Sequence, residues 1–312
     1  MKHIYFNIIA LALILRAMSI DSLAQPASEP VRVAVVTEGH SFDRGAFTQM
    51  FDSLEHITWK EHKNPDAQKL LKSESSQNYD VLVFYDTWNE ITDELKKDYL
   101  NLVKGGKPVL FLHHGICSYS EWPEFSQMVG SKYLFKNETI GGEGYKPSTY
   151  HEDVEIPVQV VDKNHFITRG TSDFVIHDEV YGGLWQSDRV HTLLETSHQD
   201  SSPKLLYTHL YEGTRIVTMI PGHGAGAMED PNYRRVLGRS LLWLAGKENL
   251  FGENSGIVLA YVTSWSRIMP DPNMVTHINY AFGHVNKTFN GVRIDNPDRL
   301  RAIAELKKQK PA

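Results

Sequence analysis

Short apolar runs alternate with amphipathic segments through the first third of the chain. An apolar run without alternation is typical of a strand buried on both faces of a parallel sheet. The predicted strands are Val31 to Val36, Ile57 to Glu61, Val81 to Tyr85 and Val109 to Leu112. The segments between them, 45–54, 64–71 and 92–104, carry apolar residues at helical spacing. This strand–helix order predicts an α/β fold with a doubly wound, mostly parallel sheet.

The pattern continues with more strands and a closing helix. Further strands are predicted at 153–161, 173–181, 190–195, 205–211 and 215–220, and an amphipathic helix runs from Pro231 to Ala245. Because Gly246 ends this helix, we expect one domain over 30–246. The polar stretch 247–256 is typical of a linker. Beyond it, strands are expected at 257–262 and 277–282, and a helix at 297–308.

The first 24 residues have the pattern of a secretory signal peptide. Lys2 supplies the positive region, Ile8 to Leu15 is apolar, and Ser22-Leu23-Ala24 is a small-x-small cleavage site. Arg16 leaves the apolar stretch too short to cross a bilayer. A lipoprotein anchor is the weaker alternative, because no cysteine lies near the cleavage site. We therefore expect a secreted or periplasmic protein, with no membrane association after cleavage.

Composition narrows the classes of partner. The chain of 312 residues is 41% hydrophobic and 22% charged, as is ordinary for a soluble globular protein. Its formal charge of −6 gives no basic surface for nucleic acid, and Lys and Arg form no polybasic run. Cys117 is the single cysteine, so no internal disulfide is expected.

Candidate site residues follow the predicted strands. Ligands of open α/β sheets bind beyond the carboxyl ends of parallel strands. The side chains at such positions are His40, Asp86, His113, His114 and His223. A single histidine is more often a surface or core residue, but five such positions along one edge indicate a site. Since strand side chains alternate, we expect one of the two adjacent histidines to orient the other.

His177-Asp178-Glu179 adds carboxylates to these imidazoles. Carboxylates beside imidazoles supply acid/base chemistry or hold a divalent cation. We predict catalytic roles for His113, His223, Asp178 and Glu179, and a zinc ion on His113, His223 and Glu179. The spacing matches no local metal motif, so this prediction depends on the fold.

Two further groups of side chains have alternative interpretations. Cys117 is a possible nucleophile, but the H-x-E pair that partners such thiols is absent, since Gly224 and Ala225 follow His223. A buried, unreactive thiol is the favoured interpretation. Aromatic residues also gather in the predicted loops, where they suit either sugar rings or loop packing. They are Tyr119, Trp122, Tyr145, Tyr150, Tyr181 and Trp185.

Residues 30–246 resemble the ThuA-like (trehalose utilisation) family. The resemblance rests on T-E-G-H at 37–40, Y-D-V-L-V at 79–83, L-H-H-G at 112–115, W-P-E-F at 122–125, D-K-N-H-F-I-T-R-G at 162–170, H-D-E-V-Y at 177–181, T-H-L-Y-E-G-T-R at 208–215 and D-P-N-Y-R-R-V-L at 230–237. It implies the flavodoxin-like fold of class I glutamine amidotransferases and the processing of carbohydrates, with ties to trehalose and keto-sugars. We assign substrate contact to His40, Asp86, His114, Trp122, His177, Tyr181 and His209.

The tail resembles a second family, the glycoside hydrolase family 18 chitinases. I-V-L-A-Y-V-T-S-W at 257–265 and V-T-H-I-N-Y-A-F at 275–282 are similar to their first two barrel strands. Two strands and a helix cannot close an eight-stranded barrel, and the acidic catalytic strand is absent after Phe282. We therefore expect an incomplete barrel fragment at 257–312 without chitinase activity.

Two functions stay open. The first is an exported carbohydrate-active enzyme, a hydrolase or isomerase that acts on glycosides or keto-sugars through the histidine/carboxylate cluster. The second is a non-catalytic sugar-binding module that accompanies a chitinase-like glycosidase. The second is favoured by Gly224, because the family usually has an acid at that position. A thiol amidotransferase is excluded by the missing H-x-E pair.

Overall fold

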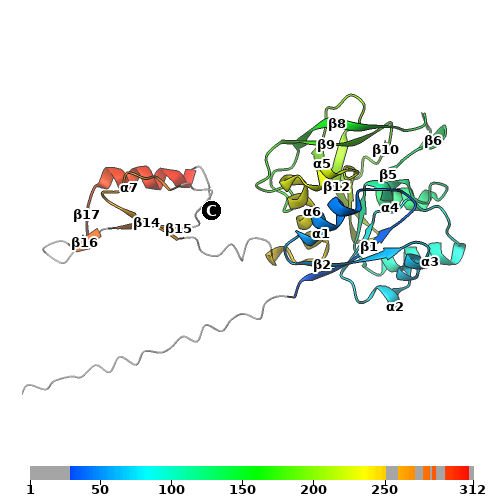
Figure 1. Cartoon of the computed structure of the whole chain (residues 1–312), viewed down its shortest axis with the longest axis horizontal. Coiled ribbons are helices and arrows are strands. Elements are labelled where there is room, and N and C mark those ends of the chain that lie inside the picture. The colour runs from blue at the N-terminus through cyan, green and yellow to red at the C-terminus, as the bar shows by residue number, and fades with distance from the viewer. Residues whose placement is uncertain (1–28, 251–258, 271–276, 282, 286–291, 309–312) are drawn as a thin grey trace, which may run out of the picture.

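The structure, a computed structural model, describes residues 29–250, 259–270, 277–281, 283–285 and 292–308 (Figure 1). A nine-stranded sheet forms its centre, in the order β2-β1-β3-β4-β13-β12-β11-β8-β9. The strands are β1 (Val31–Thr37), β2 (Ile57–Lys63), β3 (Val81–Phe84), β4 (Val109–Leu112), β8 (Thr149–Val160), β9 (Phe174–Gly182), β11 (His191–Glu195), β12 (Lys204–Tyr211) and β13 (Thr214–Met219).

The sheet has a parallel half and an antiparallel half. Strands β2, β1, β3, β4 and β13 are parallel neighbours. Strands β12, β11, β8 and β9 are each antiparallel to the strand before them in the sheet. The predicted α/β fold with a parallel doubly wound sheet is confirmed for the first half. The second half is antiparallel because no crossover helix separates its strands in the sequence.

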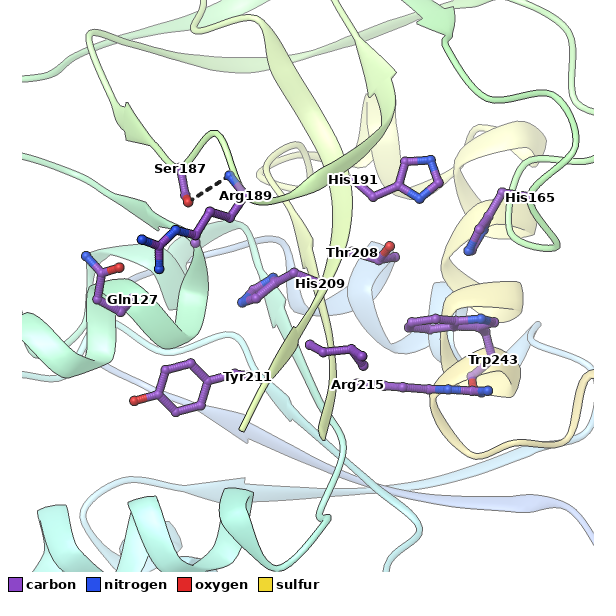
Figure 2. Close-up of a pocket in the computed structure, with 12 residues that line it drawn as sticks. Gln127, His165, Ser187, Arg189, His191, Thr208, His209, Tyr211, Arg215 and Trp243 are labelled. Atoms are coloured by element: carbon purple, nitrogen blue, oxygen red, sulfur yellow. Dashed lines mark hydrogen bonds between the residues drawn. The ribbon is translucent and has the colours of Figure 1, made fainter. Parts of the chain in front are cut away.

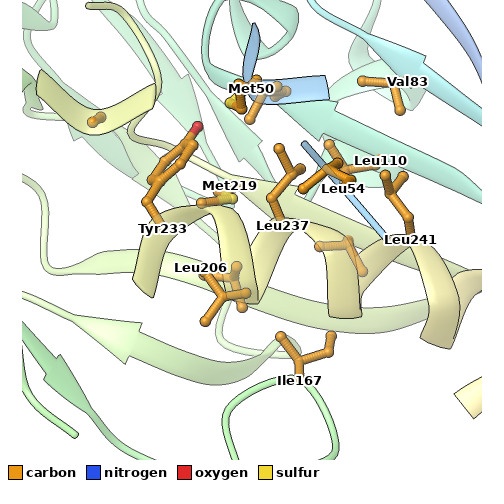
Figure 3. Close-up of a cluster of buried hydrophobic side chains, with 14 of the residues drawn as sticks. Met50, Leu54, Val83, Leu110, Ile167, Leu206, Met219, Tyr233, Leu237 and Leu241 are labelled. Carbon is orange, nitrogen blue, oxygen red and sulfur yellow. The ribbon is translucent and has the colours of Figure 1, made fainter. Parts of the chain in front are cut away.

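Helices cover both faces of the sheet. Helices α1 (Arg44–Asp52) and α6 (Pro231–Leu244) bury their apolar faces on one side. Helices α3 (Asp93–Lys104) and α4 (Pro123–Val129) do so on the other. Figure 3 shows the first layer, in which Leu237 and Leu241 of α6 lie over Met219 and Leu110 of the sheet. This two-sided burial explains why the inner parallel strands β3 and β4 are apolar throughout.

Some short elements were not expected. The predicted loop 135–150 contains a hairpin of β6 (Glu138–Ile140) and β7 (Glu143–Tyr145), which turns at two glycines with positive φ. The other unexpected short elements are α2 (Ser73–Ser76), η2 (His113–Cys117), β5 (Ser131–Lys132), β10 (Trp185–Gln186) and α5 (Ala225–Met228). The turn η1 (Asp66–Leu71) lies where the short helix 64–71 was predicted. The turn η2 matters most, because it carries both adjacent histidines.

The predicted linker begins inside the domain. Glu248–Leu250 forms the turn η3, and Leu250 is buried in the core beside α6. The signal segment 1–24 and residues 251–256 lie outside the described residues. None of the described helices is long and apolar enough to span a membrane.

The tail consists of small paired elements. Strands β14 (Leu259–Thr263) and β15 (His277–Ala281) pair in parallel, and β16 (Gly283–Val285) pairs with β17 (Val292–Ile294) antiparallel. Helix α7 (Pro297–Ala304) and the turn η4 (Glu305–Lys308) follow. The parallel pair lies where two strands were expected; the barrel fragment stays a prediction.

Candidate functional site

Four residues converge at the carboxyl edge of the parallel strands. His113 and His114 follow β4, His223 follows β13, and Glu179 reaches them from β9. The backbone of His113 turns directly after the strand, with φ at 43°. Both adjacent rings therefore face the same place, with centroids 4.3 Å apart, and the alternation expected for a continuing strand does not apply.

Three ligand atoms of this cluster lie at mutual distances that suit one metal ion. His113 Nε2 is 3.0 Å from Glu179 Oε2 and 3.3 Å from His223 Nδ1. His223 Nδ1 is 3.6 Å from the same Glu179 oxygen. Around tetrahedral zinc with bonds near 2.0–2.1 Å, neighbouring ligand atoms lie about 3.3–3.4 Å apart. The three observed distances bracket that value.

His114 adds a fourth potential ligand. Its Nε2 lies 3.3 Å from His223 Nδ1, and the four ligand atoms all lie within 4.8 Å of one another. His114 is only 2% exposed, and its Nδ1 has no hydrogen-bond partner among the described residues. From the sequence we expected this histidine to contact substrate rather than metal, because adjacent strand residues normally point apart.

The hydrogen bonds of His113 indicate which nitrogen is free. Its Nδ1 is 2.7 Å from the carbonyl oxygen of Ile220, so this nitrogen carries the proton and donates it. Nε2 then offers a lone pair, to which the Tyr181 hydroxyl, 3.0 Å away, can donate. A lone pair cannot bond to the carboxylate of Glu179. Either a second proton on His113 or a cation between the two atoms resolves that contact.

The protonation states favour metal binding. Burial, together with the neighbouring imidazoles, lowers the pKa of His114 and that of His223. Burial alone would raise the pKa of Glu179, but protonated His113 and His223 rings would lower it, and a cation bound between them would act in the same direction. Neutral imidazoles and an ionised carboxylate are the forms that coordinate metals. The residues present therefore fit a divalent cation such as zinc.

Asp178 holds the loop that carries His223. Its carboxylate accepts hydrogen bonds from the backbone N–H groups of Gly222, His223 and Gly224, at 2.6, 3.1 and 2.9 Å. Asp178 is 3% exposed and precedes Glu179 on β9, so its side chain points to the opposite face. Its carboxylate thus positions His223 and is not one of the converging ligands.

His40 and Tyr181 border the cluster. The exposed ring of His40 lies over that of His114, with centroids 3.8 Å apart, and edge-on to His223 at 5.6 Å. The buried ring of Tyr181 stacks on His113 at 4.8 Å. Of these imidazoles His40 is the one that solvent reaches most freely, which suits the predicted contact with substrate.

Other predicted site residues lie elsewhere. Asp86 is completely buried and accepts a hydrogen bond from Asn64 Nδ2 at 2.8 Å. Trp122 packs in the core against Phe125 of α4, since it directly precedes that helix. His177 is exposed outside the cluster, and its Nδ1 lies 4.0 Å from the exposed carboxylate of Asp153. His209 lines a separate pocket at the other end of β13, described below.

The structure also shows the surroundings of Cys117 and of two of the aromatic residues. Cys117 is buried, and burial raises the pKa of its thiol, so the unreactive interpretation agrees with its environment. Tyr119 packs with Trp122 in the core layer of α3 and α4. Tyr150 is 59% exposed on β8, away from any packing role.

The fold and the site together describe an α/β protein whose doubly wound sheet carries a histidine/carboxylate cluster at its carboxyl edge. The profile of the ThuA family, described as trehalose utilisation, matches residues 32–244. The chain therefore belongs to the ThuA family, and the predicted glutamine amidotransferase-like fold accords with this membership. No curated protein matches this sequence.

Solved structures of ThuA-like proteins have a similar fold. One from Parabacteroides merdae is 17% identical, with a TM-score of 0.57 over 69% of this chain and 90% of that one. Another from Bacteroides uniformis is 16% identical, with a TM-score of 0.53 over 71% of this chain and 94% of that one. At this identity the likeness shows the fold alone.

Proposed function

We propose that this protein is an exported, metal-dependent enzyme that hydrolyses or isomerises glycosides or keto-sugars. The observation that carries this proposal is the compact set of His113, His223 and Glu179 ligand atoms. Two histidines and one glutamate are a zinc ligand set that leaves a coordination position open for water or substrate. The family's link to trehalose utilisation supports a carbohydrate as the substrate.

Each residue has a role in this proposal. Bound zinc would polarise a sugar oxygen or lower the pKa of a bound water. His113, His223 and Glu179 hold the ion, and the hydrogen bond to Ile220 fixes the tautomer of His113. His40, exposed above the cluster, contacts the sugar. Asp178 is a positioning residue that fixes the loop of His223.

A turnover screen tests this function. The zinc-loaded protein without residues 1–24 is incubated with a panel of glycosides and their 3-keto forms, and products are followed by chromatography. We expect turnover that is lost in His113→Ala and in His223→Ala. His177→Ala is the matched control, because this exposed histidine lies outside the cluster. Turnover that survives both cluster variants contradicts the proposal.

Gly224 favours a second candidate, a sugar-binding module without chemistry. The family's usual acid is absent there, and the Gly224 N–H is bonded to Asp178. A Cβ added to Gly224 would lie 3.8 Å from the Asp178 carboxylate, so an acid would fit without a clash. Gly224→Glu tests whether the missing acid matters: restored turnover in an otherwise inactive protein supports this candidate. We further propose that 257–312 opens a chitinase-like domain that the module would accompany.

A further inference from the structure

A pocket of about 880 Å³ lies near the amino end of β13, whereas the cluster lies beyond the carboxyl end of that strand. Figure 2 shows the residues that line the pocket. Arg215, near the start of β13, lines it, whereas His223 follows the end of that strand. At about 3.3 Å per residue, the six residues of β13 separate the two places by roughly 20 Å. The pocket is therefore distinct from the metal cluster, and its volume is typical of small-molecule sites.

The pocket exists because strand β11 begins too late to pair with the last residues of β12. Strand β11 begins at His191, which pairs with Thr208, so β12 continues beyond it with β13 as its neighbour. Leu210 in this stretch is 66% exposed. The chain before β11 bends away, and Ser187 Oγ accepts a hydrogen bond from the Arg189 N–H at 3.2 Å. The gap thus opens around the free edge of β12: Gln127 of α4 and Arg189 lie on one side of this strand, and Trp243 of α6 lies on the other (Figure 2).

The lining is rich in hydrogen-bond donors and contains no carboxylate among the described residues. It consists of Gln127, Gly130, His165, Ser187, Arg189, His191, Thr208, His209, Leu210, Tyr211, Arg215 and Trp243. Hydroxyl, amide, imidazole and guanidinium groups suit a ligand that offers many acceptor oxygens. A cation would find no compensating charge in this lining.

Of the cationic side chains that line the pocket, one has no carboxylate partner among the described residues, although Glu124 and Glu212 lie close enough to Tyr211 for their charges to raise its pKa together with burial. Arg215 is paired with Glu248 at 2.9 Å, and His191 with Asp162 at 3.0 Å. Asp188 is fully exposed and lies 3.8 Å from Lys204. Within the described part of the chain, the guanidinium of Arg189 forms no ion pair. Its planar donors match a carboxylate or a phosphate.

Two histidines of the pocket, His165 and His209, contribute neutral imidazole groups. The Ile167 N–H donates to His165 Nδ1 at 3.2 Å, so the proton of this ring is on Nε2 and available to a ligand. Burial lowers the pKa of His165 and that of His209. His209 lies near the backbone of Gln127 and Met128, but neither of its ring nitrogens has a hydrogen bond of normal geometry.

From this lining we infer that the pocket binds an anionic sugar, with its carboxylate or phosphate on Arg189 and its hydroxyl groups on the polar lining. The inference is independent of the metal cluster. A free inorganic anion would use Arg189 but would leave the remaining volume unfilled. A sugar acid and a sugar phosphate share the required chemistry, and the experiment below distinguishes them.

Isothermal titration calorimetry of the chain without residues 1–24 tests the inference. The probes are glucuronate, glucose 6-phosphate, neutral glucose and inorganic phosphate. We expect glucuronate or glucose 6-phosphate to bind more tightly than glucose or phosphate, and the tighter of the two identifies the anion. Arg189→Gln should weaken this binding by about tenfold or more. Arg267→Gln, an exposed arginine of the tail, is the control with the same charge change and should bind as the wild type does.

A second comparison separates this pocket from the cluster. Binding should persist in His223→Ala, whose change lies beyond the carboxyl end of β13. Loss of binding in His223→Ala, equal binding by Arg189→Gln and the wild type, or no preference for the anionic sugars would each overturn the inference. The proposed metal-dependent turnover would fail or succeed separately, because Arg189 takes no part in it.

Discussion

The Nε2 atom of His113 lies 3.0 Å from the Glu179 carboxylate, although the other nitrogen of the ring is 2.7 Å from the Ile220 carbonyl. With its proton committed to Ile220, the neutral ring has no hydrogen to offer Glu179. The contact therefore requires a positive charge. We attribute that charge to a metal ion, since His223 Nδ1 converges on the same two atoms.

Zinc should stabilise the fold. At a free concentration of about 100 times its dissociation constant, a ligand of the native state adds about 2.7 kcal/mol to the free energy of unfolding. We expect the melting temperature to fall on chelation and to recover when zinc is added. The measurement is differential scanning fluorimetry, with Glu179→Gln as the comparison. A melting temperature that stays the same after chelation and after the addition of zinc counts against the proposed metal site.

Asp178→Asn should loosen the loop of His223 without removing a ligand. The amide keeps one acceptor oxygen in place of two, so at least one of the three backbone N–H bonds is lost. We expect about 1–3 kcal/mol less stability and zinc affinity lowered about 10–100-fold. Urea unfolding and zinc titration measure the two effects. Asp153→Asn, with its side chain 94% exposed, is the control and should change neither.

Asp86 should make stability fall as pH rises. Burial raises the pKa of this carboxyl from 3.8 to about 7, so the folded state holds its proton where the unfolded chain has released it. The folded state therefore loses stability relative to the unfolded one between about pH 4 and pH 7. Asp86→Asn removes this loss. It should stabilise the protein by roughly 2–3 kcal/mol more at pH 8 than at pH 5.

Urea midpoints of both proteins at the two pH values measure this difference. Asn64 can still donate to the amide oxygen of the variant, so the local hydrogen bond is kept. Equal gains at pH 5 and pH 8 would show that Asp86 does not titrate in this range.

The tail should be dispensable, but only beyond Leu250. The domain boundary that we predicted at residue 246 implies that a cut after Lys247 leaves stability unchanged. Leu250 is 4% exposed in the core, and Glu248 is paired with Arg215, so that cut removes packed residues. We expect it to cost about 1.5–3 kcal/mol, and a cut after Leu250 to cost little. Thermal unfolding of the two truncated chains measures the difference. An equally large loss of stability after both cuts would show that residues beyond 250 stabilise the domain.

The sequence predicted the parallel strands well because their burial on both faces leaves a continuous apolar run. It also placed His113 and His223 at one edge, since both follow such strands. It could not show that Asp178 binds three backbone N–H groups, because these groups leave no trace in residue identity. The pocket of Arg189 was missed as well, since it depends on where β11 begins. Trp122 was assigned to substrate because its loop position was visible and its packing on Phe125 was not.

Metal analysis of the purified protein tests the central claim most directly. After dialysis against zinc and then against metal-free buffer, zinc per chain is counted by mass spectrometry, and X-ray absorption measures its bonds. We predict one zinc per chain, nitrogen ligands at about 2.0–2.1 Å, and loss of the metal in His113→Ala and His223→Ala but not in His177→Ala. A wild-type protein without bound metal, or zinc retained by both cluster variants, would contradict the account.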